Sequence, residues 1–153
     1  MNAVKLLLLS LLLLSFNGCE KKKITTELHE VHWDRDMCER CKMVTSDRHH
    51  AVQVINPQDG KAYMFDDIGC TLLWFEDEKI AWKEKAKIWI TDVDTKKWID
   101  ARRAYYDSDN ITPMAYGFAA HVSKEHLNNP IAYTVLFKKV LEIEQKNNSR
   151  RAY

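Results

Sequence analysis

An apolar run near the N-terminus limits how much of this chain can fold. The eleven residues from Leu6 to Phe16 are interrupted only by Ser10 and Ser15, and Lys5 precedes them. The run is too short to cross a bilayer as a stable helix, but it has the length of a signal-peptide core. Removal of residues 1–18 would leave 153 − 18 = 135 residues. That is the size of one ordinary domain with its own hydrophobic core.

The apolar run ends at Asn17-Gly18-Cys19, which resembles a bacterial lipobox. In such a segment, signal cleavage leaves a lipid-modified cysteine at the new N-terminus. We therefore predict a lipoprotein signal peptide over residues 1–18, lipidation of Cys19, and a lipid-anchored linker over residues 19–32. Glu20 is not the aspartate that usually retains such proteins at the inner membrane, which favours the outer membrane and the periplasm. An ordinary secretory signal or an uncleaved anchor is the alternative.

The charge composition argues against one class of partner. Lys5 is the only charged residue of the signal segment, so the mature chain has 23 − 1 = 22 basic and 22 acidic side chains. Domains that bind nucleic acid usually present a basic field, and this nearly neutral chain has none. We therefore predict no nucleic-acid partner.

Hydrophobic patterning predicts an α+β fold. Residues 51–55 and 61–65 have the composition of strands and flank the turn-forming segment 56–60, which indicates a β-hairpin. Asp66 or Asp67 can then cap a helix that runs to about residue 78. Further expected elements are strands at 87–91, 98–106 and 116–122, and a helix at 135–145, with 131–137 as an alternative strand. This order of elements implies mainly antiparallel strand pairing.

Three cysteines remain after the predicted lipidation site, and they are Cys38, Cys41 and Cys70. An odd number does not fit a closed disulfide framework, although Cys38 and Cys41 could pair in an exported protein. These two lie in a polar segment, which is unusual for cysteines that only fill a core. Cys70 lies among Ile68, Leu72 and other apolar residues, and we predict that it is a buried structural thiol.

A thiolate and a thioether lie two residues apart at Cys41 and Met43. In an extended segment, side chains at positions i and i+2 point to the same side. Soft sulfur ligands of this kind select Cu(I) among biological metals, whereas zinc has little use for a thioether. Met114 could close such a site from elsewhere in the fold, although a lone methionine is often a core filler. Secondary donor candidates are Cys38, His50 and His121.

Four motifs, in order along the chain, are shared with one known family. They are Met37-Cys38-x-x-Cys41-x-Met43, the segments Met64–Gly69 and Trp98–Tyr106, and Pro113-Met114-Ala115-x-Gly117. On these motifs the chain resembles the NosL family, the copper-binding lipoproteins encoded with nitrous oxide reductase in denitrifying bacteria. The family usually has glycine where this chain has Lys42, and a lysine does not easily adopt a positive φ.

The resemblance implies a fold, a site and a function. The fold is a single compact domain of two ββαβ-like halves with mainly antiparallel strands, which we place at residues 33–147, followed by a tail at 148–153. The implied metal ligands are Cys41, Met43 and Met114. The implied function is that of a periplasmic, lipid-anchored Cu(I)-binding chaperone, without enzymatic activity. Its implied partners are nitrous oxide reductase and the maturation apparatus of that enzyme.

Other functions stay open at this point. Cys38-Glu39-Arg40-Cys41 has the C-x-x-C spacing of thiol–disulfide oxidoreductases, but no long amphipathic helix follows it. Cys38, Cys41 and two histidines could instead form a structural zinc site. The cysteines could also be incidental in a lipid-anchored assembly factor that binds no metal. The paired carboxylates Asp66 and Asp67 suggest acid–base chemistry, although helix capping explains them more simply.

Overall fold

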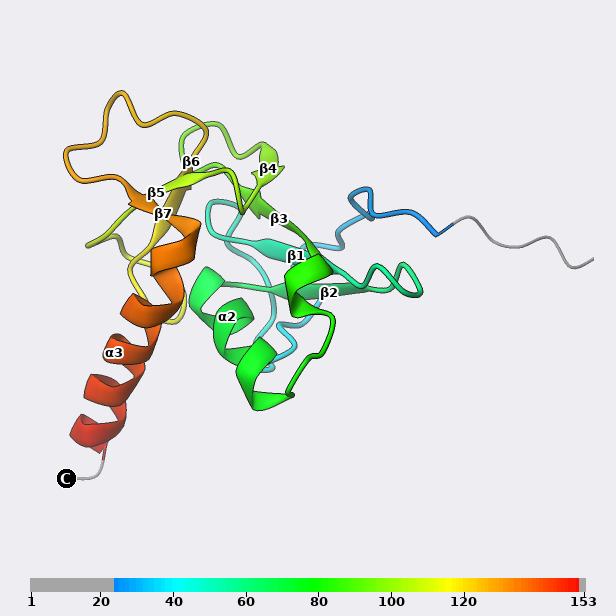
Figure 1. Cartoon of the computed structure of the whole chain (residues 1–153), viewed down its shortest axis with the longest axis horizontal. Helices are drawn as coiled ribbons and strands as arrows, with labels where there is room; N and C mark the ends of the chain where they lie inside the picture. Colours follow the sequence, from blue (N-terminus) through cyan, green and yellow to red (C-terminus); the bar gives the residue numbers. More distant parts are fainter. Residues whose placement is uncertain (1–23, 152–153) are drawn as a thin grey trace, which may run out of the picture.

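The computed structural model describes residues 24–151, so the predicted signal peptide and the predicted lipidation site Cys19 lie outside the described residues. Within these residues, two antiparallel sheets and two main α-helices form an α+β fold, as predicted (Figure 1). Within residues 24–151, none of the helices has the length and apolar character needed to span a bilayer.

The first half of the domain contains a four-stranded antiparallel sheet with the strand order β2-β1-β3-β4. Its elements are β1 (Val52–Ile55), β2 (Ala62–Phe65), α2 (Ile68–Asp77), the 3-10 helix η2 (Lys83–Lys85), β3 (Lys87–Thr91) and β4 (Trp98–Asp100). The predicted hairpin is confirmed, because Val54 of β1 pairs with Tyr63 of β2. Gly60 supplies the positive φ of 75° in the turn between these strands. On its other side β1 pairs with β3, which makes β1 and β3 the central strands.

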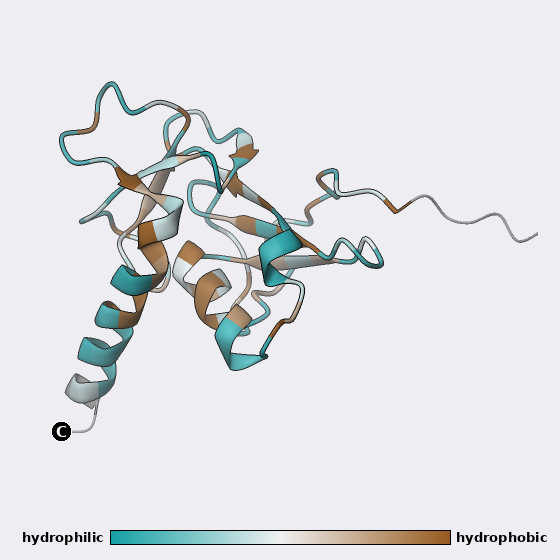
Figure 2. Ribbon diagram, in the orientation of Figure 1, coloured by the Kyte–Doolittle hydropathy of each residue, from teal (hydrophilic) through white to brown (hydrophobic). Residues whose placement is uncertain are grey.

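Helix α2 begins where the sequence predicts it. Asp67 is the N-cap, and its side chain accepts a hydrogen bond from the Gly69 N–H at 2.8 Å. All residues from Ile68 to Phe75 are buried, because the helix packs between the first sheet and α3. Figure 2 shows that α2 is mostly apolar, whereas the C-terminal turns of α3 are hydrophilic. The helix therefore places its first turn deep inside the domain.

The second half contains a three-stranded antiparallel sheet with the order β6-β5-β7, followed by the C-terminal helix. Its elements are β5 (Tyr105–Asp107), β6 (Ala119–His121), β7 (Ile131–Ala132) and α3 (Tyr133–Arg151). Leu136 and Val140 of α3 are fully buried in the common core. The two sheets meet at Asp92, which forms a parallel bridge with Ala120 and accepts a 2.8 Å hydrogen bond from the Val122 N–H through its carboxylate.

Three elements differ from their predicted extents. The strand expected at 98–106 is two strands, because the Asp100 carbonyl accepts hydrogen bonds from the N–H groups of Arg103 and Ala104 and turns the chain between β4 and β5. The strand expected at 116–122 pairs only over Ala119–His121. The C-terminal helix spans Tyr133–Arg151 instead of 135–145, and it begins directly after the short strand β7.

Candidate metal centre

A tight loop between Met37 and Val44 presents two of the three described cysteines. Met37 and Val44 form an isolated antiparallel bridge, and the Cys38 N–H donates to the Met43 carbonyl at 2.8 Å. Lys42 takes a φ of 60°, a left-handed conformation that glycine would adopt more readily. This turn points Cys38 into the core, where it is 0% exposed, and leaves Cys41 half-buried at the edge.

The start of α2 supplies the other two donors. Because Asp67 serves as the cap, its neighbour Asp66 is free to face the cysteine loop. The Cys41 thiol donates to Asp66 Oδ2 at 3.3 Å. Asp66 Oδ1 is also buried, but it has no hydrogen-bond partner within the described part of the chain. Cys70 lies four residues after Asp66, in the first turn of α2, and is 0% exposed.

These residues form one cluster of potential metal ligands. One donor atom each from Cys38, Cys41, Asp66 and Cys70 lies within 4.8 Å of all the others. Two sulfurs bound to the same metal ion at about 2.3 Å each lie at most about 4.6 Å apart. The four side chains therefore need to move only slightly to share one ion. The buried, unpaired oxygen of Asp66 fits such a role, because a bound cation would give it the partner it lacks.

The protonation of the cluster is uneven. A hydrogen bond donated by the Cys70 thiol lowers the pKa of Cys38 to about 7, although burial acts in the opposite direction. Donation of that bond, together with burial, raises the pKa of Cys70 well above its ordinary value. Burial raises the pKa of Cys41 to about 12. A thiophilic cation would therefore meet one partly ionised thiol and two protonated ones, and its binding would release protons.

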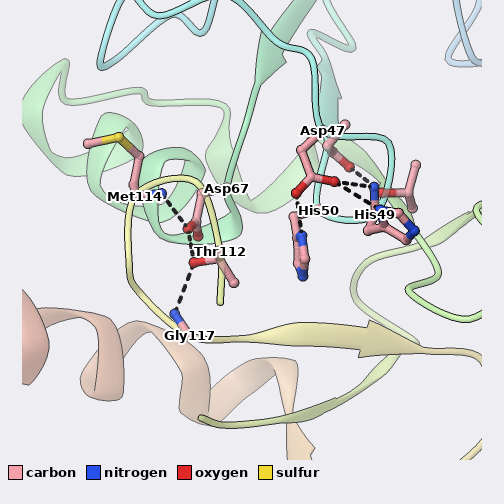
Figure 3. Close-up of polar contacts among 9 residues, drawn as sticks. Asp47, His49, His50, Asp67, Thr112, Met114 and Gly117 are labelled. Carbon is pink, nitrogen blue, oxygen red and sulfur yellow. Dashed lines mark hydrogen bonds and ion pairs between the residues drawn. The ribbon is translucent and has the colours of Figure 1, made fainter. Parts of the chain in front are cut away.

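The predicted thioether ligands occupy different places. Met43 is 50% exposed at the rim of the cysteine loop. Met114 is half-buried, and its N–H donates to Asp67 Oδ2 at 3.4 Å (Figure 3). Thr112 donates to the same oxygen at 2.6 Å, so the loop that carries Met114 is fastened to the cap of α2. The fold thus brings the Met114 backbone beside the cluster, and the roles of Met43 and Met114 as ligands stay predictions.

The secondary histidine candidates are held by carboxylates elsewhere. His50 Nδ1 lies 3.0 Å from Asp47 Oδ2, and in Figure 3 its ring and the Met114 sulfur lie on opposite sides of Asp67. His121 lies between two carboxylates, 3.1 Å from Asp94 and 3.3 Å from Asp107. Neither histidine belongs to the four-residue cluster. Within residues 24–151, the potential ligands that gather around Cys38 and Cys41 are thus a third cysteine and an aspartate, without a histidine.

Sequence reasoning missed two members of the cluster. Cys70 is buried as predicted, but it lies among potential ligands and not in a purely apolar surrounding. Asp66 was interpreted as a possible helix cap or as one of a pair of acid–base carboxylates, and not as a metal ligand. One signal was present for Asp66, since a helix needs a single capping residue and the pair Asp66-Asp67 leaves one aspartate over for another role.

Comparisons with known proteins agree with the fold. No protein-family model matches the chain, and no curated protein matches it in sequence. One similar solved structure is described as the copper chaperone NosL from Shewanella denitrificans. The chain has the NosL fold. The similarity has a TM-score of 0.60 at 11% sequence identity and covers 72% of this chain and 95% of the other. The NosL-like fold expected from the sequence motifs is therefore confirmed, although the two sequences have diverged widely.

Proposed function

We propose that this protein is a Cu(I)-binding chaperone whose central ligands are Cys38, Cys41 and Cys70. The observation that carries the proposal is the convergence of three sulfur atoms and the Asp66 carboxylate within 4.8 Å in a NosL-like fold. Cu(I) prefers soft sulfur donors, and the solved structure with this fold is described as a copper chaperone. Binding and release of an ion need no catalytic group, so we do not propose an enzyme.

The cluster has the layout expected of a carrier. Cys41 lies at the surface with the exposed Met43 beside it, whereas Cys38 and Cys70 lie behind them in the core. An ion can therefore arrive at the outer sulfurs and pass to the inner ones by exchanging one ligand at a time. The same exchange in reverse returns it to a partner. Met114 is the proposed additional thioether, supplied by the loop fastened to Asp67.

The recipient and the location belong to the same proposal. Resemblance to the NosL family supports delivery of copper to nitrous oxide reductase and its maturation apparatus.

The signal-like N-terminus and Cys19 support a periplasmic, lipid-anchored protein. Durable membrane anchoring takes more than one acyl chain, and the lipid-modified cysteine of a bacterial lipoprotein carries several. Wild-type protein should partition with membranes, whereas Cys19→Ser should abolish processing at that site. A Cys19→Ser protein that is processed and membrane-bound like wild type would contradict the anchor.

A thiol–disulfide oxidoreductase fits the geometry less well. The first cysteine of its C-x-x-C segment, Cys38, is fully buried, and an attacking thiolate must reach a disulfide on another protein. The two cysteines also lie in a loop before β1, not at the start of a helix that would stabilise a thiolate.

Zn(II) competes with Cu(I) for this site more closely, because three cysteines and a carboxylate can give it four tetrahedral donors.

The deciding experiment compares the metals directly. Reduced mature protein in mild detergent is titrated without oxygen with Cu(I) and Zn(II) against chelators of known affinity, and with insulin as a disulfide substrate. We expect tight retention of one Cu(I) and no disulfide reduction. X-ray absorption at the copper edge should count mostly sulfur neighbours. Preferential retention of Zn(II) over Cu(I), or efficient reduction of insulin, would overturn the proposal.

A further inference from the structure

One arginine between the two loop cysteines connects the metal cluster to three distant parts of the fold. Arg40 Nε lies 2.8 Å from Asp77 Oδ2, at the last residue of α2. Arg40 Nη1 donates to the Tyr116 hydroxyl at 3.0 Å, and Arg40 Nη2 lies 3.2 Å from Glu144 Oε1 in α3. The Tyr116 hydroxyl in turn donates to Glu144 Oε2 at 2.8 Å. We call Arg40, Asp77, Tyr116 and Glu144 the arginine clamp.

The clamp is partly withdrawn from water, unlike the neighbouring charges of the same loop. The Arg40 side chain is 22% exposed, whereas that of Lys42 is 63% exposed and pairs only locally with Glu39. Burial alone would lower the pKa of Arg40, but Asp77 and the other partners outweigh it and raise that pKa. Because charged hydrogen bonds strengthen as water is excluded, the contacts of Arg40 with Tyr116 and Glu144 constrain the loop more than exposed ion pairs do. Asp77 is 52% exposed, so its contact contributes less.

Tyr116 fixes the clamp against the helix turn that carries the other donors. Its ring lies so close to Gly69 that a Cβ at that position would be 2.2 Å from ring atoms. Gly69 precedes Cys70 in the first turn of α2. A side chain at position 69 would push Tyr116 away, so glycine permits the close approach. Arg40 therefore ties the loop of Cys41 to the same turn from which Cys70 enters the cluster.

The loop itself gives Cys41 little support. Among the described residues, the hydrogen bond of its side chain is the one from the thiol to Asp66. The next residue, Lys42, holds a left-handed conformation that costs a non-glycine residue free energy. The Lys42 N–H bonds back to the Cys38 carbonyl at 3.0 Å, which closes the turn on itself. The Glu39 N–H ties the start of the turn to β2 through the Met64 carbonyl at 2.9 Å. Arg40, directly before Cys41, adds the side-chain attachment to α2 and α3.

Helix α3 supplies the far end of the clamp. Among its residues with described burial, Val140 is the last that is fully buried, and Glu144 lies one turn beyond it. After Glu144 the side chains of residues 145–149 are mostly exposed, and Figure 1 shows these turns extending away from the sheets. A displacement of this end of α3 would pull on Arg40 and, through it, on the loop that carries Cys41.

Building on the proposed function, we propose that Arg40 is a positioning residue that holds Cys41 in the cluster, and that its bonds to Glu144 and Tyr116 set the rate at which copper leaves. A partner that shifts the end of α3 would then open the cluster on contact, because the clamp links the two. The bound state stays closed in solution and releases its ion where a recipient is present.

Two measurements on the mature protein in mild detergent test this proposal. The first is the rate constant of Cu(I) transfer to a large excess of bathocuproine disulfonate. The second is the rate constant of Cys41 alkylation by iodoacetamide in metal-free, reduced protein, read by mass spectrometry well below the unfolding temperature. The variants are Arg40→Gln, Glu144→Gln and the double variant. Matched controls are Arg48→Gln, which removes an arginine that pairs with Asp34 away from the clamp, and the exposed Glu142→Gln on α3.

We expect Arg40→Gln to raise both rate constants about tenfold and Glu144→Gln to raise them about threefold, in line with coupling energies of networked side chains. The double variant should be no faster than Arg40→Gln alone, because both changes act through one network. The two controls should match wild type.

Rate constants within twofold of wild type for Arg40→Gln, even with a lowered unfolding temperature, would show a merely structural role and overturn the proposal. Fully multiplicative effects in the double variant would do the same. If Arg40→Gln does not fold, Glu144→Gln decides alone, since glutamine keeps the size and one acceptor oxygen. If wild type retains no Cu(I), the proposed function fails, and the alkylation rates still judge the clamp separately.

Discussion

Replacement of Cys70 by alanine tests whether the buried thiol is a ligand, as we propose, or only a core residue, as the sequence suggests. The change removes one buried sulfur atom from the first turn of α2, which is 0% exposed there. The lost burial and the small remaining cavity should cost about 1–2 kcal/mol of unfolding free energy. A domain with ordinary stability of about 5–15 kcal/mol tolerates that loss. The variant should therefore remain folded.

The expected effect on copper is much larger than the effect on folding. Cys70→Ala deletes a sulfur donor and also the hydrogen bond that lowers the pKa of Cys38. Mutations that only touch the partners of metal ligands cost about 10–100-fold in affinity, so loss of a ligand should cost at least about 100-fold. The assay is a Cu(I) competition titration on wild type and variant, combined with a sulfur count from X-ray absorption.

A neighbouring residue offers a matched control. Thr71 is also fully buried in α2, it lies outside the cluster, and its hydroxyl has no hydrogen-bond partner within the described residues. Thr71→Val keeps the shape and removes an unpaired polar group, so it should leave both folding and copper affinity close to wild type. Wild-type copper affinity in a well-folded Cys70→Ala protein would refute the cluster as the copper site.

Three further predictions follow from other parts of the structure. Met114→Leu conserves side-chain volume and should cost under about 1.5 kcal/mol of unfolding free energy. If Met114 is a ligand, the Cu(I) affinity falls and the sulfur count from X-ray absorption drops by about one. Equal affinity in variant and wild type would exclude Met114 as a ligand. Lys42→Gly relieves a left-handed residue that costs about 1–2 kcal/mol and adds back about 0.5–1 kcal/mol of chain entropy. The net stabilisation expected from these two ranges is about 0–1.5 kcal/mol, measured by urea unfolding. A destabilised variant would contradict it. Burial would raise the pKa of Asp92, but hydrogen bonds from Thr95 and Val122 outweigh it and lower that pKa. The ionised Asp92 therefore stabilises the fold at pH values above its unfolded pKa of about 3.9, and this contribution is lost as the pH falls through the lower folded pKa. Compared with wild type, Asp92→Asn should be less stable at neutral pH and should lose less stability on acidification. If the unfolding free energies of the two proteins fall in parallel with pH, Asp92 does not have this role.

Local features of the fold could be predicted from the sequence because their causes lie within a few residues. The hairpin around Gly60 follows from two β-rich segments and the turn residues between them. The start of α2 follows from an aspartate before an apolar segment. The same local reasoning placed Cys38 and Cys41 in one segment. The family resemblance, not local reasoning, marked the position of Lys42 as one suited to glycine, and φ there is 60°.

Tertiary structure decided which residues share the site. Cys38 and Cys70 are 32 positions apart, and only the packing of α2 on the sheet brings them within 4.8 Å. The choice of Asp67 as the cap depends on Thr112 and Met114, which bond to it from a loop more than forty positions away and leave Asp66 for the cysteines. Arg40 finds its partners in the same way, at α2, Tyr116 and α3. Periodicity and turn chemistry act between neighbours along the chain, whereas a metal site and its clamp need donors from segments that only the folded core brings together.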